Sequence, residues 1–139
     1  MVPGSYQVRL TVAGVGAARP FRILPDPRLA ASGVTQADLE QQFRLAIAAR
    51  DLASEVADLV TAVAEARKQA DNERLRVLAG RLTAAGGRYP TPELAEQAAF
   101  LANMTLVADQ RMGRDVVERL AELRGELARA KTDFLVAKK

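Results

Sequence analysis

The spacing of apolar residues changes once along this 139-residue chain, near residues 24–28. Before that point apolar and polar residues alternate, as in a β-strand with one buried face. After it apolar residues recur every three or four positions, which is typical of amphipathic helices. The segment LPDPR lies between the two patterns, and its two prolines favour an extended link. The sequence therefore predicts a short β element followed by a helical body.

Residues 5–24 are predicted to form a β-hairpin. Apolar residues alternate along SYQVRLTV, the glycines of AGVGA allow a turn, and RPFRIL is the expected return strand. Pro20 is compatible with an edge or with the start of a strand. The predicted interaction site is one apolar face, formed by Tyr6, Val8, Leu10, Val12, Phe21 and Ile23. Because a lone two-stranded hairpin is marginally stable in water, we expect this face to be covered.

The first long helix is expected to begin after Thr35, a good N-cap, with Asp38 three residues later as a short capping box. Leu39, Phe43 and Ile47 widen its apolar face at the start. The main stripe has heptad-like spacing: Leu45, Ala49, Leu52, Val56, Leu59, Val63, Ala66 and Ala70.

A break is expected at Asp71–Asn72, because these residues suit helix caps better than helix interiors. One unbroken helix from Thr35 to Ala85 would be about 75 Å long, which no later segment could flank. The shorter helix after the break is expected to bury Leu75, Leu78, Ala79 and Leu82.

The segment AAGGRYPTPE predicts a loop, with Gly86 and Gly87 near the end of one helix. Thr91 is the expected N-cap of the next helix, Pro92 its first residue and Glu93 part of its first turn. That helix is expected to bury Leu94, Ala98, Leu101, Thr105 and Ala108, with Phe100, Met104 and Val107 widening the face, and to break at Gly113. The last helix has the clearest stripe: Val116, Leu120, Leu123, Leu127, Ala130, Phe134 and Ala137.

These elements define a mainly α fold. Short connections favour antiparallel neighbours, so we expect an up-and-down bundle of three or four helices preceded by the hairpin. The expected division is a hairpin in residues 1–28 and a helical bundle in residues 29–139. The length fits one hydrophobic core rather than two large domains.

The composition argues against several kinds of chemistry. The chain contains neither Cys nor His, which removes disulfides, thiol nucleophiles, Cys/His zinc sites and histidine general bases. No apolar stretch is long enough to span a bilayer, and the N-terminus lacks the basic-then-apolar pattern of a signal peptide.

The positive charge is concentrated in residues 1–28, which hold four arginines and one aspartate. In the rest of the chain acidic and basic residues alternate and balance, as on a solvated helix surface. We therefore expect no nucleic-acid partner. A weak basic binding surface formed by Arg9, Arg19, Arg22 and Arg28 stays an alternative.

No catalytic, cofactor-binding or metal-ligating residue is predicted. Glu118 and Glu122 lie four residues apart, but between arginines on a polar helix face. Glu93, Glu96 and Asp109 lack the spacing of a metal site. Flexible methionines can line a promiscuous groove, but Met104 and Met112 are expected to fill the core. Tyr6 is expected on the apolar strand face, and Tyr89 is expected to anchor the glycine-rich loop.

Three segments carry a resemblance through their order and spacing: PGSYQVRLTVAG…RPFRILPDPRL, TQADLEQQFRLAIAARDLASEV and RYPTPELAEQAAFLANMTLVADQRMGRDVVERLAELRGELARA. Taken together they resemble the C-terminal region of bacterial sortilin-like (BNR-repeat) β-propeller proteins. The first segment resembles the end of the small β-sandwich domain that follows the propeller, and the other two resemble the start and the end of the helical segment after it. The resemblance runs from about Pro3 to about Lys131, and residues 69–88 look shorter than the usual helical segment.

Proteins of this family are often labelled glycosyl hydrolases because their propeller blades carry an Asp-box, S-x-D-x-G-x-T-W. This chain has no Trp and no such repeat, so an activity of the propeller is not carried over. The resemblance implies a C-terminal accessory region of a larger protein that is exported to the periplasm or the extracellular space. Residues 1–28 would be the remnant of its β-sandwich.

We therefore expect a non-catalytic accessory domain that mediates assembly or protein–protein contact, with no cofactor. Its partners would be its own propeller and sandwich domains or another protein. Exposed strand edges predict a homodimer or a higher oligomer through residues 5–24. The alternative is a glycan- or peptide-binding accessory domain of a hydrolase, which a surface groove lined by Tyr89, Phe100 or Met104 would favour.

Overall fold

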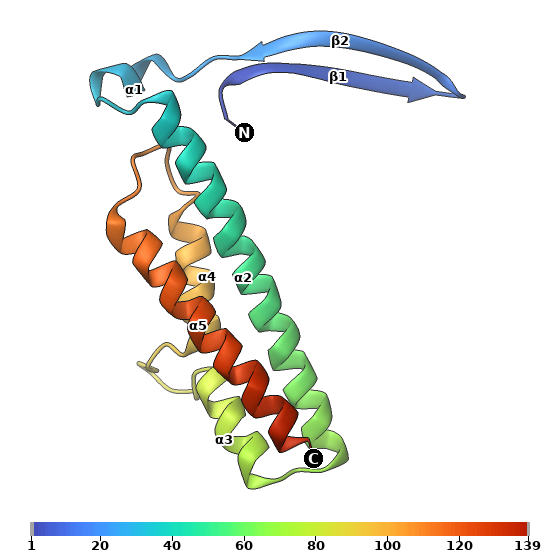
Figure 1. Cartoon of the computed structure of the whole chain (residues 1–139), viewed down its shortest axis with the longest axis vertical. Helices are drawn as coiled ribbons and strands as arrows, with labels where there is room; N and C mark the ends of the chain where they lie inside the picture. Colours follow the sequence, from blue (N-terminus) through green and yellow to red (C-terminus); the bar gives the residue numbers. More distant parts are fainter. Residues whose placement is uncertain (1, 139) are drawn as a thin grey trace. The chain divides into compact units, whose positions relative to one another are not determined.

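The structure, a computed structural model, describes residues 2–138. They form, in order, β1 (Gly4–Val12), β2 (Val15–Ile23), α1 (Pro27–Ala31), α2 (Gln36–Gln69), α3 (Glu73–Leu82), α4 (Leu94–Met104) and α5 (Arg114–Ala137) (Figure 1). The predicted class, a mainly α bundle preceded by a β-hairpin, is confirmed. The chain divides into two compact units. The N-terminal unit holds the residues up to Arg44 together with Ala108–Met112, and the bundle unit holds Leu45–Val107 and the residues from Gly113 on.

The hairpin of the N-terminal unit has longer strands and a tighter turn than the sequence predicts. β1 and β2 pair antiparallel from Gly4 opposite Ile23 to Val12 opposite Val15. Only two residues connect them, Ala13 at φ 50° and Gly14 at φ 84°. Positive φ at both positions is the signature of the type I′ turn, whose twist matches that of the strands. The turn lies within AGVGA, as expected, and occupies only the first two residues of that segment because the strands pair up to it.

Pro20 lies within β2, opposite Gln7. The described residues form a two-stranded sheet, so each strand has an unpaired edge where a missing N–H removes no ladder hydrogen bond. The edge position expected for this proline is confirmed.

The short helix α1 was not expected after the hairpin. The Asp26 carboxylate accepts a hydrogen bond from the backbone N–H of Arg28 at 2.9 Å, which satisfies a free donor of the first turn. Pro27, the first helical residue, has no N–H to satisfy. These local signals allow one helical turn within the segment that was expected to be extended.

Both ends of α2 agree with the sequence. At its start the Thr35 hydroxyl accepts from the N–H of Asp38 at 3.2 Å, and the Asp38 carboxylate accepts from the N–H of Thr35 at 2.8 Å. This reciprocal pair is the expected capping box. α2 ends at Gln69, and Asn72 caps α3 by accepting from the N–H of Leu75 at 3.0 Å. The predicted break at Asp71–Asn72 is confirmed.

In the bundle unit α5 runs antiparallel to α3 and α4, which follow one another along its length and both contact it (Figure 1). The 10 residues of α3 and the 11 of α4 are about 15 and 17 Å long, which together nearly match the 24 residues of α5. Lys131 of α5 bonds Glu55 of α2 at 2.5 Å. The most deeply buried large side chains of this core are Leu52, Val56, Val63, Leu75, Leu78, Leu82 and Leu123.

Three helix boundaries differ from the sequence expectation. α3 ends at Leu82, before the glycines. α4 begins at Leu94 with Glu93 as its N-cap, so the expected cap at Thr91 is wrong. The Glu96 carboxylate fixes this start by accepting from the N–H groups of Glu93 and Ala84, at 3.0 and 3.1 Å.

The third difference is the C-terminal end of α4, which was expected to continue past Ala108. The helix instead ends at Met104, and buried Thr105 is its C-cap. Leu106 and Val107, just beyond the end, are exposed. α5 then starts after Gly113, which is its N-cap.

The widened apolar faces are also only partly buried. Leu39 is buried, but Phe43 is 46% exposed and Phe100 is 68% exposed. No helix within residues 2–138 is long and apolar enough to cross a lipid bilayer.

Candidate interaction sites

The strand register brings all six residues of the predicted hairpin face together. Tyr6 lies opposite Phe21, and their rings stack with centroids 5.7 Å apart. Leu10 lies opposite Ala17, and Val12 opposite Val15. We define the apolar hairpin face as Tyr6, Val8, Leu10, Val12, Val15, Ala17, Phe21 and Ile23. The same register places Arg19 on this face, opposite Val8, which the sequence expectation missed.

The apolar hairpin face is uncovered over most of its length. Leu10, Val12 and Val15, near the turn, are 67%, 62% and 76% exposed. At the other end Tyr6 and Ile23 are half-buried, and the Tyr6 hydroxyl donates to the carbonyl of Val2 at 2.5 Å. The turn half of the hairpin is therefore the part that most needs a covering surface.

The bundle unit contains a groove of about 860 Å³ between α4 and α5. Phe100, Leu101, Met104 and Val116 contribute its apolar surface. Phe100 is exposed and Met104 half-buried, so the expectation that they fill the core is only partly right. The remaining lining residues are Pro92, Glu96, Gln97, Asp115, Glu118, Arg119 and Glu122. We call this surface the α4–α5 groove.

The charged lining of the α4–α5 groove is mainly acidic, with four carboxylates and one guanidinium. Arg119 is already engaged, because it bonds the Glu122 carboxylate at 2.7 Å and the side-chain amide of Gln97. Glu118 pairs with Arg114 at 2.6 Å, but Arg114 is 90% exposed. Such exposed pairs contribute little energy, so a basic partner can compete for these carboxylates.

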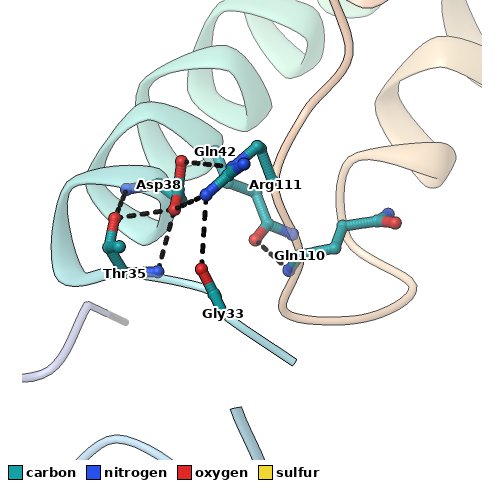
Figure 2. Close-up of polar contacts among 6 residues, drawn as sticks. All are labelled: Gly33, Thr35, Asp38, Gln42, Gln110 and Arg111. Carbon is teal, nitrogen blue, oxygen red and sulfur yellow. Dashed lines mark hydrogen bonds and ion pairs between the residues drawn. The ribbon is translucent and has the colours of Figure 1, made fainter. Parts of the chain in front are cut away.

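A polar network in the N-terminal unit fastens residues 108–112 to α2 (Figure 2). The buried Gln42 amide donates to the carbonyl of Ala108 at 2.6 Å and accepts from the N–H of Gln110 at 3.0 Å. Arg111 bonds the Asp38 carboxylate at 3.1 Å and the carbonyl of Gly33 at 3.3 Å. Because its members satisfy one another, this network stabilises the end of the α4–α5 connection rather than offering free groups to a ligand.

The network also changes the titration of Asp38. Hydrogen bonds from the Thr35 hydroxyl and backbone N–H, and from Arg111, lower the pKa of Asp38 from 3.8 to about 2. Each of these donors favours the ionised carboxylate. Asp38 is therefore a charged anchor near neutral pH and not a proton donor.

The other residues weighed from the sequence take structural positions. Glu118 and Glu122 pair with arginines, as expected for an exposed helix face. Met112 is buried, whereas Tyr89 is 85% exposed and lies beneath the guanidinium of Arg88. The expected anchoring role of Tyr89 is thus wrong, because its ring points into solvent. Across residues 2–138, no group of three or more acidic side chains is arranged to hold a metal ion.

The sequence did not identify the α4–α5 groove as a candidate acidic site. Phe100 and Met104 are four residues apart, as are Glu118 and Glu122, so each pair shares a helix face. Those spacings were the available signal for each face. They do not predict that the two faces meet, because the contact between α4 and α5 that brings both pairs to one groove is a tertiary contact.

Comparisons with protein-family models, curated proteins and solved structures found no match for this chain. The resemblance to sortilin-like propeller proteins therefore stays a prediction.

Proposed function

We propose that this chain is a non-catalytic interaction module that mediates assembly through its β-hairpin. The observation that carries the proposal is the exposure of the apolar hairpin face, with Leu10, Val12 and Val15 each more than half exposed. Contiguous exposed apolar surface is typical of interaction sites. Both strands also have an unpaired edge, which another chain can extend.

The biological setting of this module follows from the resemblance. It would be the C-terminal accessory region of an exported sortilin-like propeller protein, with the hairpin as remnant of the preceding β-sandwich. Its partners are the propeller and sandwich domains, another protein, or a second copy. Of these we favour the second copy, and we propose a homodimer through residues 5–24.

A non-catalytic role is supported by the chain's own chemistry. The sequence lacks Cys and His, which supply most activated nucleophiles and general bases near neutral pH. The carboxylates Glu118 and Glu122 are exposed and paired with arginines, whereas a glycosidase needs two carboxyl groups flanking its substrate.

A second candidate function is supported by the α4–α5 groove. Phe100 and Met104 line it, and an exposed aromatic beside a flexible methionine is suited to binding a peptide or a glycan. Under this alternative the chain is a ligand-binding accessory domain of a hydrolase. Tyr89 does not line the groove, so Phe100 is the one aromatic side chain of the groove lining.

The proposed assembly can be tested by sedimentation velocity and light scattering on the whole chain. We expect the wild type to associate and the Leu10→Asp variant to be monomeric. The matched control is Thr11→Asp, because Thr11 pairs with Gly16 on the opposite face of the same hairpin. A wild type that stays monomeric at high concentration contradicts the proposal, as does equal loss of association in both variants.

A further inference from the structure

The hairpin carries an unbalanced charge that limits what can cover it. β1 and β2 contain Arg9, Arg19 and Arg22 and no acidic residue. Two hairpins packed face to face would bring guanidinium groups together without a carboxylate between them. Like charges juxtaposed in an interface are unfavourable, so a second hairpin is a poor cover.

Arg19 further restricts which surfaces can cover the hairpin. Its position opposite Val8 places it on the apolar hairpin face. Covering that face with an apolar surface would bury Arg19, and a buried charge without a partner is strongly destabilising. The covering surface must therefore combine apolar contact with at least one carboxylate.

The α4–α5 groove combines these two properties. Phe100 and Met104 present apolar surface, and Glu118 and Glu122 lie along the α5 side. The lining as a whole has an excess of three carboxylates over guanidinium groups, opposite in sign to Arg19, the one charged residue on the apolar hairpin face. Arginine also forms favourable bidentate hydrogen bonds with carboxylates.

The dimensions show which part of the hairpin fits. α4 has 11 residues, about 17 Å, which corresponds to about five residues of an extended strand. That length matches the turn half of the hairpin, where Leu10, Val12 and Val15 are the most exposed. Arg19 lies at the inner edge of the same half.

We propose that the turn half of the hairpin of one copy docks in the α4–α5 groove of a second copy. This inference rests on the proposed function, because it takes the hairpin as the assembling element and names the surface that receives it. Each copy offers one hairpin and one groove, so two copies that exchange hairpins reciprocally use all four surfaces.

The test is a complementation experiment with two whole-chain variants. Leu10→Asp blocks the hairpin, and Phe100→Glu blocks the groove; both side chains are more than 60% exposed, so neither change disturbs a core. We expect each variant alone to be monomeric by sedimentation velocity. We expect a one-to-one mixture to form a mixed dimer that is weaker than the wild type, because one of its two contacts remains. Asn103→Glu, at an exposed position of α4 outside the groove lining, is the control for Phe100→Glu.

The outcomes separate this inference from the proposed function. If Phe100→Glu dimerises like the wild type while Leu10→Asp does not, the hairpin assembles by another surface. The groove inference is then overturned and the proposed function stands. If the wild type is monomeric, both are overturned. If both variants are monomeric and the mixture is also monomeric, the inference of exchange between copies fails.

Salt dependence and charge reversal give an independent readout. We expect the dissociation constant to rise between 0.1 and 1 M NaCl, since the Debye length falls from about 10 to about 3 Å. Contact between two basic hairpins would show the opposite trend. Arg19→Glu should raise the dissociation constant about tenfold or more, whereas Arg9→Glu on the opposite face should change it much less. Equal effects of the two reversals would contradict docking by the apolar hairpin face.

Discussion

The side-chain amide of Asn72 donates a hydrogen bond to the backbone carbonyl of Ala137 at 3.1 Å, although 65 residues separate the two along the chain. The oxygen of the same amide accepts from the N–H of Leu75 at 3.0 Å and caps α3. One side chain thus ends the break after α2, starts α3 and binds the last turn of α5. A residue expected only as a local helix breaker also joins two elements of the bundle unit.

Replacing Asn72 tests this double role. Asn72→Ala removes the cap and the bond to Ala137, and we expect a loss of about 2 kcal/mol in the free energy of unfolding. Asn72→Asp keeps an oxygen for the N–H of Leu75 but loses the donor, so we expect a smaller loss of about 1 kcal/mol. Urea unfolding followed by far-UV circular dichroism measures both. Equal losses in the two variants would mean that the cap contributes nothing.

Gln42 is expected to determine how firmly residues 108–112 are held. Gln42→Ala leaves the carbonyl of Ala108 and the N–H of Gln110 without their side-chain partner, which should cost about 1–3 kcal/mol. Hydrogen exchange should show faster exchange at the Gln110 amide. Gln41→Ala changes the neighbouring exposed residue and should leave both quantities unchanged. An unchanged exchange rate of the Gln110 amide in Gln42→Ala would show that the Gln42 hydrogen bonds do not hold residues 108–112 in place.

The two-residue turn predicts a stabilising substitution. Ala13 has φ 50°, a left-handed conformation that costs alanine about 1 kcal/mol and that asparagine tolerates better. Ala13→Asn should therefore protect the hairpin amides from hydrogen exchange more strongly than in the wild type. Gly14→Ala should have the opposite effect, because Gly14 has φ 84°. If Ala13→Asn weakens protection, the turn geometry is not the one described.

Acid should destabilise the N-terminal unit through Asp38 and Asp26. Thr35 and Arg111 lower the pKa of Asp38 to about 2, and Arg28 lowers the pKa of Asp26 to about 2. The unfolded chain takes up these protons nearer pH 4, so the stabilisation is complete above about pH 5 and is lost as the pH falls towards 2. The urea midpoint should therefore drop between about pH 5 and about pH 2.5.

Two comparisons sharpen this acid prediction. In Asp38→Asn the urea midpoint should drop less than in the wild type, because one of the two carboxyl groups with a lowered pKa is gone. Between about pH 5.5 and 8 the midpoint should stay nearly constant, since the chain has no His or Cys to titrate there. If the urea midpoint falls equally with decreasing pH in Asp38→Asn and the wild type, protonation of Asp38 does not contribute to the loss of stability in acid.

Features that depend on near neighbours in the chain could be predicted from the sequence. The alternation in β1, the Thr35–Asp38 capping box, the break at Asp71–Asn72 and the buried stripe of α5 all agree with the structure. The six residues of the predicted hairpin site also share one face. Strand alternation, capping and helical spacing each act over a few residues, so the sequence states them directly.

Features that need a distant partner could not be predicted in the same way. An apolar stripe predicts that a helix face is buried, but not how wide a strip its neighbours cover, so Phe43 and Phe100 were misplaced. The end of α4 at Met104 coincides with a connection whose backbone is bound by Gln42, 66 residues away from Ala108. The acidic α4–α5 groove exists because two separate helices meet. The sequence by itself therefore determined which elements form, which faces are apolar and where α2 ends, while tertiary contacts decided where α4 ends and which apolar residues stay exposed.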